Sequence, residues 1–419
     1  MIKWIMGNES KKEGFWWNAT GGGLSSGQAA ILLVFISHQL DITIAGIVTI
    51  AYALANLFAA MTRYGVRNYQ VTDVNRRFSF GDYFYSRVFS VLLTVGICAV
   101  YMTWCAVSNG DSISKLVILA EITILKLIDS FEDVYLGCYQ QSGHFCAGAK
   151  IMAVRLILST SMICITICAG LGIYFSLFSG ICVSLILDFY FIHGTFQITK
   201  AKIGSMNRNN VCKLMVKCLP LCIGTTLSMY IGNVPKYMID IYMDEKVQAI
   251  FGYIMMPVFV VMLLNTFLYQ PVIKELGDIW KDKDYKQFRK KIKWQCLIVC
   301  GMTVLIIVGG MVIGLPALSV IYNVDLSMYR MEFLILLLGG GFYALAYYLN
   351  VPITTIRKQK YIAVGYAAAA IASVLTGHIF VIRYGMMGAA VLYLSINILL
   401  AIIYGFVLLL GIRENSERK

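Results

Sequence analysis

Charged side chains are scarce in this sequence. Asp, Glu, Lys and Arg together make up 14% of the 419 residues, whereas soluble domains carry about 25%. Hydrophobic residues make up 59% of the chain. A chain of this composition cannot cover its apolar surface with polar groups in water. A soluble fold is therefore excluded, and a membrane protein is indicated.

The motifs of the common enzyme classes are also missing. The sequence has no Gly-rich phosphate loop, no metal-ligand cluster and no Ser/His/Asp arrangement, and its four histidines are scattered singly. The segments predicted to lie outside the cell are too short for a catalytic domain. We therefore expect a protein that is not an enzyme and that uses no cofactor beyond a coupling H⁺ or Na⁺.

What the sequence does contain is a series of apolar stretches about as long as a helix that crosses a bilayer. Barrel strands would give short alternating runs instead. The stretches predict an all-α integral membrane protein with about twelve transmembrane helices, near residues 15–37, 42–62, 84–107, 113–140, 147–171, 174–198, 213–235, 247–273, 294–315, 331–353, 360–381 and 385–411. The hairpins at 38–41 and 171–174 are very short.

Lysine and arginine lie mainly on one side of these spans. With the N-terminus inside, 29 of the 35 basic residues fall in segments assigned to the cytoplasm, among them Arg87 and Arg155. Five fall outside, and Lys126 lies within a span. Cytoplasmic segments of membrane proteins carry such an excess, so both termini are predicted to be cytoplasmic. The net charge of +13 is explained by this topology, and no nucleic-acid partner is expected.

Two halves of the chain are similar. Leu40-Asp41 precedes the second span and Met243-Asp244 precedes the eighth, and the apolar runs that follow match for about thirty residues. We therefore predict an N-terminal six-helix lobe at 1–205 and a C-terminal six-helix lobe at 206–419. Six spans per half give both lobes the same orientation, as a parallel pseudo-repeat around a central cleft.

Ionisable residues inside spans are the main candidates for function, because each is costly unless it faces protein or water. Lys126, Asp129 and Asp133 are three and four residues apart, which places them on one helix face near mid-bilayer. Lys126 is a candidate for attracting an anionic substrate and Asp129 for binding a coupling cation. The alternative is an ion pair that only fixes the packing of the helices.

Further candidates lie in the sixth and seventh spans and in two basic segments. Asp188 is a lone acid in the sixth span, and a role in ion coupling or in packing is left open. The seventh span ends in Asn233-Val-Pro235-Lys236 and continues to Asp240 on the same helix face. Lys236 and Asp240 either line a cavity at a proline bend or reach the outer surface.

The loop after the second span, from Arg63 and Arg67 to Arg76-Arg77, is a candidate for gathering a lipid-linked phosphate, although positive-inside charge explains it almost as well. The 274–293 segment is basic with interleaved aromatic residues. It predicts an amphipathic helix at the membrane surface more readily than a specific site.

Several strings resemble the Wzx-type polysaccharide flippases, which share a superfamily with the lipid II flippase and the MATE exporters. The strings are Trp17-Asn18, Ala45-Gly46, the segment Arg63–Asp73, the segment Phe80–Arg87, Glu132-Asp133-Val-Tyr-Leu-Gly137 with Gln140, and Asn233-Val-Pro-Lys236-Tyr237. The last departs from the family pattern, because lysine stands where arginine is usual. Lysine keeps the charge but loses the bidentate fork.

The resemblance implies transport of an undecaprenyl-diphosphate-linked oligosaccharide from the cytoplasmic to the outer leaflet of a bacterial inner membrane by alternating access. It implies contact with membrane lipids and with the polymerase and glycosyltransferases of the same pathway. The candidate substrate-binding residues are Lys126, Lys236, Asn233, Arg63, Arg67 and Asn18, and the candidate ion-coupling residues are Asp129, Asp240 and Asp188. A MATE-like drug exporter and a membrane-embedded polymerase or acyltransferase are the alternatives.

Overall fold

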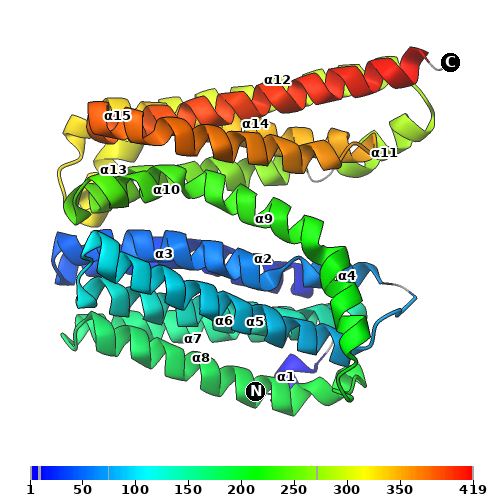
Figure 1. Cartoon of the computed structure of the whole chain (residues 1–419), viewed down its shortest axis with the longest axis horizontal. Helices are drawn as coiled ribbons and strands as arrows, with labels where there is room; N and C mark the ends of the chain where they lie inside the picture. Colours follow the sequence, from blue (N-terminus) through cyan, green and yellow to red (C-terminus); the bar gives the residue numbers. More distant parts are fainter. Residues whose placement is uncertain (1, 8–10, 74, 270–271, 418–419) are drawn as a thin grey trace. The chain divides into compact units, whose positions relative to one another are not determined.

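The computed structural model describes residues 2–7, 11–73, 75–269 and 272–417 (Figure 1). The described elements are all helices, and no strand occurs among them. They form two compact units, Met1–Met229 and Tyr230–Lys419, and the division falls within one long helix. Each unit is described below by itself. The predicted lobes with a boundary at 205/206 and a cleft between them stay a prediction.

The first unit is built from six long helices and several short ones. They are α1 (Ile2–Ile5), α2 (Lys11–Gln39), α3 (Ile42–Arg63), α4 (Val66–Thr72), α5 (Phe80–Trp104), the π-helical turn Cys105–Asn109, α6 (Ile113–Gln141), α7 (Phe145–Cys168), α8 (Ile173–Thr195), the 3-10 turn Phe196–Thr199 and the first part of α9 (Arg208–Tyr242).

The second unit continues α9 and holds the remaining helices. They are α10 (Glu245–Tyr269), α11 (Val272–Lys281), α12 (Tyr285–Gly309), the π-helical turn Gly310–Gly314, α13 (Leu315–Tyr322), the 3-10 turn Ser327–Tyr329, α14 (Arg330–Thr355) and α15 (Lys360–Glu417). α15 contains two helices that join at Gly385, whose φ of 56° and ψ of −135° are not helical. Glycine adopts such a conformation without a Cβ clash.

Nine helical stretches of the described residues are long and apolar enough to cross a membrane. The stretch at Lys360–Glu414 holds both helices of α15. α6 and α10 are also 29 and 25 residues long, and α6 carries five ionisable residues between Glu121 and Asp133. The predicted class of an all-α membrane protein is confirmed. The two predicted tight hairpins are also present, between Gln39 and Ile42 and between Cys168 and Ile173.

α6 is the central helix of the first unit. It packs against α3, α5, α7 and α8, whereas α5 and α8 make little contact with each other. The buried residues of α3 include many alanines, and such small side chains let helix backbones approach closely. A helix surrounded on most sides by protein can carry charged side chains at membrane depth. The arrangement of the bundle therefore explains where the ionisable residues of α6 are accommodated.

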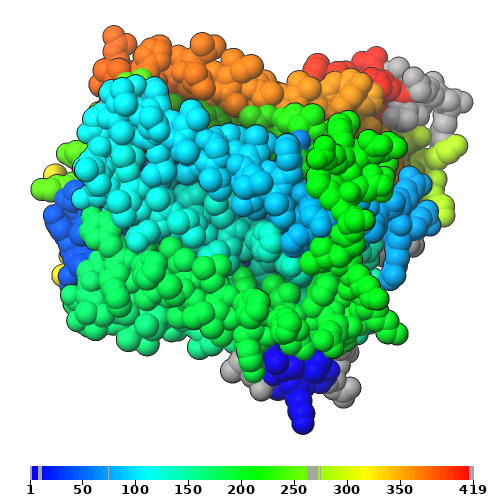
Figure 2. Space-filling view, turned by 60° about the horizontal axis from the view of Figure 1, so that its bottom comes forward, coloured from blue at the N-terminus to red at the C-terminus, as the bar shows by residue number. Residues whose placement is uncertain are grey.

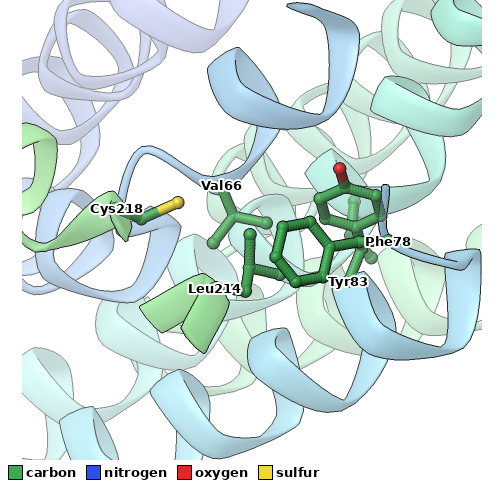
Figure 3. Close-up of a cluster of buried hydrophobic side chains, with 6 residues drawn as sticks. Val66, Phe78, Tyr83, Leu214 and Cys218 are labelled. Atoms are coloured by element: carbon green, nitrogen blue, oxygen red, sulfur yellow. The ribbon is translucent and has the colours of Figure 1, made fainter. Parts of the chain in front are cut away.

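A hydrophobic cluster joins α4, α5, α6 and the start of α9. It contains Val66, Phe78, Tyr83, Val134, Leu214 and Cys218, and Figure 3 shows five of them directed toward a common centre. Gly65 makes the sharp turn from α3 into α4 with a φ of +69°, and a Cβ there would lie 2.6 Å from the Cβ of Leu221. This glycine therefore permits α9 to pack closely against the turn.

Candidate functional site

The charged side chains in the middle of α6 are buried inside the first unit. Lys126 is 1% exposed, and its Nζ lies 3.2 Å from Asp129 on the same helix. It also donates to the side-chain oxygen of Gln28 on α2 at 2.9 Å and lies 5.5 Å from the ring centre of Tyr52 on α3. The ion pair that was the alternative to functional roles for these residues is therefore present. Lys126 is held by α2, α3 and α6 together.

Arg155 on α7 connects three carboxylates. Its Nη2 lies 2.6 Å from Glu132 and 2.8 Å from Asp129, both on α6, and its Nε lies 3.2 Å from Asp188 on α8. Arg155 is itself 1% exposed. The planar guanidinium offers several donors in one fork, and lysine could not meet three carboxylates in this way. One buried side chain thus links three helices of the bundle.

These five residues do not balance in charge. Two cations, Lys126 and Arg155, face three carboxylates, Asp129, Glu132 and Asp188, so the group carries a formal charge of −1 when all are ionised. Oε1 of Glu132 is buried and has no hydrogen-bond partner among the described residues. A charge left uncompensated inside a bundle is costly. The group is therefore suited to take up one proton or another cation.

A second buried group lies next to the first. Asp133 on α6 accepts from Arg87 on α5 at 2.9 Å and from Arg67 on α4 at 3.1 Å. Arg67 also donates to Gln140 at 3.2 Å, and Arg87 to the carbonyl of Thr62 at 2.5 Å. Three of the six strings that resemble the flippases therefore meet in space, because Arg67 of α4 and Arg87 of α5 both contact the second half of α6.

The segment between α4 and α5 is fixed by Asp73. The carboxylate accepts from the hydroxyl of Tyr83 at 2.8 Å and from the backbone NH of Phe78 at 3.2 Å. Burial opposes ionisation of Asp73, but hydrogen bonds from Arg77, Tyr83 and Phe78 outweigh it and hold the pKa of this carboxyl below its ordinary value. The ionised form of Asp73 therefore stabilises the turn.

A cavity of about 690 Å³ opens between α5, α6 and α8. Its walls are mostly aliphatic and aromatic, and Tyr135, Asp188 and His193 are its ionisable residues. Asp188 thus faces the cavity and also pairs with Arg155. Figure 2 shows the surfaces of α5 and α6 (cyan) and of α8 (green) adjoining on one face. Asp188 is therefore the point at which the buried charged group meets an open space.

The candidates on α9 lie in the second unit. Lys236 is buried, and its Nζ lies 5.8 Å from the ring centre of Phe259 on α10. Asn233 is also buried, whereas Asp240 is half-buried. The helix continues through Pro235 to Tyr242. Lys236 therefore does not reach an exposed surface of this unit, which was one of its two predicted placements.

The two remaining candidates are less enclosed. Arg63 ends α3 and is half-buried, and its Nε has no hydrogen-bond partner in the part of the chain that the structure describes. Asn18 is half-buried on α2. The substrate and ion-coupling roles of all the candidate residues stay predictions.

Two arginines have partners that the charge count did not predict. Arg155 and Arg87 were counted among the cytoplasmic charges at the ends of spans, but both are buried and paired with acids of α6. Arg87 lies about two turns and Arg155 nearly three turns from the N-terminal end of its helix. Glu132 was also missed as a site residue. An ionisable residue inside an apolar run was the available signal.

No protein-family model and no curated protein matches this sequence. Solved structures do match over nearly the whole chain. An inward-facing multidrug resistance MATE family transporter of the MOP superfamily aligns with a TM-score of 0.71 and 11% identity, covering 93% of this chain and 94% of that one.

A Vibrio cholerae MATE transporter in its bent form aligns with a TM-score of 0.61 and 14% identity, covering 97% of each chain. A MOP superfamily transporter from Pyrococcus furiosus aligns with a TM-score of 0.56 and 11% identity, covering 99% of this chain and 98% of that one. At these identities the likeness is one of fold. The chain has the fold of the MATE transporters.

Proposed function

We propose that this chain is a transporter that flips an oligosaccharide carried on undecaprenyl diphosphate from the cytoplasmic to the outer leaflet by alternating access. The likeness in fold to MOP superfamily transporters supports the transporter part of this proposal. The resemblance of several strings to the polysaccharide flippases supports the cargo. The proposed location is a bacterial inner membrane, with both termini in the cytoplasm.

The observation that carries the proposal is that each compact unit holds a buried lysine. Lys126 and Lys236 are both enclosed by apolar helices. A diphosphate cannot cross hydrocarbon alone, and buried cations offset its charge. Asp129, the carboxylate that holds Lys126, is also paired with Arg155. If Lys126 turned toward an anionic ligand, Arg155 would still pair with Asp129.

The same fold is compatible with more than one cargo. The Pyrococcus furiosus protein is a MOP superfamily transporter for which a reversed polarity of the binding pocket suggests a different function. Buried lysines in this chain favour an anionic cargo over the cationic drugs that an acidic, aromatic site would favour. Asn233 and Asn18 would add hydrogen bonds to sugar hydroxyls, and Arg63 and Arg67 would receive the phosphate at the cytoplasmic side.

Cation coupling follows from the charge of the buried group. Asp129, Glu132 and Asp188 share Arg155 and Lys126, and the formal charge of −1 favours uptake of one H⁺ or Na⁺. Asp188 connects this group to the cavity. Binding of the cation changes which carboxylate holds Arg155, and α6, α7 and α8 would respond together. Asp240 is the proposed counterpart in the second unit.

Depletion of the protein in its native host tests this function. We expect the lipid-linked oligosaccharide to accumulate on the cytoplasmic leaflet, as detected by sidedness labelling. Wild type should reverse the accumulation, and Lys126→Met should not, because it keeps the volume and removes the charge. Lys115→Met is the matched control, since Lys115 is a lysine of the same helix that pairs with Asp111 at its first turn. Accumulation that Lys126→Met also reverses would contradict the role of Lys126.

A drug exporter is the second candidate, and one observation favours it. The cavity that Asp188 lines is aliphatic and aromatic, as a site for lipophilic cations would be. A drug-susceptibility panel separates the two functions. Sensitivity to cationic drugs on depletion, without accumulation of a lipid-linked glycan, would favour export.

We propose that the chain has no enzymatic activity, and the same depletion experiment tests this. A membrane-embedded polymerase or acyltransferase of the pathway would leave single lipid-linked repeats on the outer leaflet. The proposed partners are the lipid-linked oligosaccharide itself, membrane lipids, and the polymerase and glycosyltransferases of the pathway.

A further inference from the structure

The basic segment at the start of α12 forms a defined surface in the second unit. Asp284 caps the helix, its Oδ1 accepting from the backbone NH of Gln287 at 2.9 Å. α11 packs beside α12, and Trp280 of α11 lies 4.9 Å from the ring of Phe288 and 5.2 Å from that of Tyr285. Phe288 and Ile292 are buried. One face of the first turns of α12 is thus fixed against α11.

The opposite face carries four exposed cations. Lys286, Arg289, Lys290 and Lys293 are spaced three, four and seven residues from the first, so they lie on one side of the helix. Together with Tyr285, Trp294 and Leu297 they line a surface hollow of about 790 Å³. We call these seven residues the α12 basic face.

The cations of the α12 basic face are not neutralised by the protein. No described carboxylate lies within ion-pair distance of any of the four. Their neighbour Lys291 points elsewhere and pairs with Glu275 of α11 at 2.7 Å. Four like charges on two turns repel one another, which costs stability unless an anion is bound between them. The α12 basic face is therefore suited to bind an anionic ligand.

The same face becomes apolar at its C-terminal end. Trp294 is 60% exposed and Leu297 is 63% exposed, and the exposed Val304 and Leu305 follow on the same helix. Tryptophan is the residue type enriched at the boundary between headgroups and hydrocarbon. The change from charge to hydrocarbon within one turn matches a ligand that has an anionic end and an apolar chain. A nucleic acid or a soluble anion would leave the apolar end unused.

We propose that the α12 basic face binds an anionic membrane phospholipid. Lys286, Arg289, Lys290 and Lys293 surround its phosphate, and Trp294 and Leu297 contact the first part of an acyl chain. The inference does not depend on which cargo the protein transports. The sequence predicted one amphipathic surface helix at 274–293, whereas the structure divides this segment between α11 and the first turns of the long helix α12. The proposal assigns a lipid site to the α12 part.

Lipid retention by the purified full-length chain tests the site. The protein is reconstituted in bilayers of phosphatidylglycerol and phosphatidylcholine, extracted in mild detergent, and its bound lipids are counted by native mass spectrometry. We expect wild type to retain phosphatidylglycerol in preference to phosphatidylcholine. The variant with Lys286→Gln, Arg289→Gln, Lys290→Gln and Lys293→Gln should lose about tenfold of this preference, because each basic residue near an anionic surface contributes to binding.

A matched control separates a site from general charge. Lys202→Gln, Arg208→Gln, Lys213→Gln and Lys217→Gln remove three lysines and one arginine that are also exposed and predicted to be cytoplasmic. This control should retain phosphatidylglycerol like wild type. Equal loss in both quadruple variants would overturn the proposal, as would full retention in the α12 variant.

Two further measurements complete the test. Trp294→Ala removes an exposed ring without changing the charge and should weaken retention by about threefold. Retention unchanged in Trp294→Ala would contradict the contact with the acyl chain. All four substituted cations are exposed, so gel filtration should show the same monodisperse protein as wild type. The site and the transport function are separated by this design, because lipid retention is measured without any transport.

Discussion

Arg155 in the first unit and the α12 basic face in the second put the same kind of side chain in opposite settings. Arg155 is enclosed between helices and meets three carboxylates. The four cations of the α12 basic face are exposed and pair with none of the described carboxylates, unlike their neighbour Lys291, which pairs with Glu275. A buried charge is tied to its partners because water cannot replace them, whereas an exposed charge remains available to a ligand. The buried Arg155 links helices of the bundle. The exposed cations of the α12 basic face are available to bind an anionic lipid.

The largest effect is expected at Arg155. Arg155→Ala would leave three buried carboxylates without their shared cation, which should cost roughly 3–5 kcal/mol of stability. We expect little monodisperse protein in detergent, with Arg155→Lys intermediate because lysine keeps the charge but not the fork. The measurement is the yield after gel filtration together with the thermal unfolding midpoint. If Arg155→Ala unfolded at the wild-type midpoint, the contrast between the buried Arg155 and the exposed cations of the α12 basic face would be contradicted.

The next effect is expected at Asp133. Asp133→Asn leaves Arg87, which is 0% exposed, facing a neutral side chain, and it should cost about 2–4 kcal/mol. Asp111→Asn is the control, because its pair with Lys115 at 3.0 Å lies at the first turn of α6 and joins residues of one local segment. Thermal unfolding of the two variants side by side gives the comparison. Equal shifts would mean that pairing Asp133 with arginines from two other helices adds nothing beyond a pair within one segment.

A smaller effect is expected from pH at the turn before α5. The pKa of Asp73 is held below its ordinary value of about 3.9, so its contribution to stability is complete above that pH. The contribution is lost as pH falls through the lowered pKa. Asp73→Asn should remove this part of the acid dependence of the unfolding midpoint. An acid limb of the same depth in the variant would contradict the role of Asp73.

The smallest effect is expected at the pair of Lys291 and Glu275. Both side chains are partly exposed, so Lys291→Gln should change stability by less than about 1 kcal/mol, despite the distance of 2.7 Å. Lys291 is adjacent to the α12 basic face, so this variant tests an exposed cation that does have a carboxylate partner. A loss as large as that of Asp133→Asn would show that exposure is a poor guide to the strength of these pairs.

Local spacing predicted part of the site and could not predict the rest. The pair of Lys126 and Asp129 follows from three-residue spacing on one helix, and it is present. The pairing of Arg155 with Asp188 joins two helices whose relative rotation depends on packing across the bundle. Charge counting treated Arg155 as a topology signal because a single sequence gives the position of a residue along a span but not the face that it presents.

The helices themselves were predicted well, since long apolar runs and tight hairpins are local properties. The spans near 360–381 and 385–411 correspond to the two helices that meet at Gly385. The similarity in fold to MATE transporters agrees with the superfamily that the strings resembled. The cargo depends on the few side chains that line a site, and neither composition nor fold determines them.

Reconstituted flipping tests the central claim most directly. Purified protein in liposomes that contain a fluorescent oligosaccharide on undecaprenyl diphosphate would be assayed for movement between leaflets under an imposed cation gradient. We expect transport by wild type and Lys115→Met and loss of transport in Lys126→Met at equal reconstitution. Transport by Lys126→Met at the wild-type rate, or no transport of this lipid by folded wild type, would contradict it.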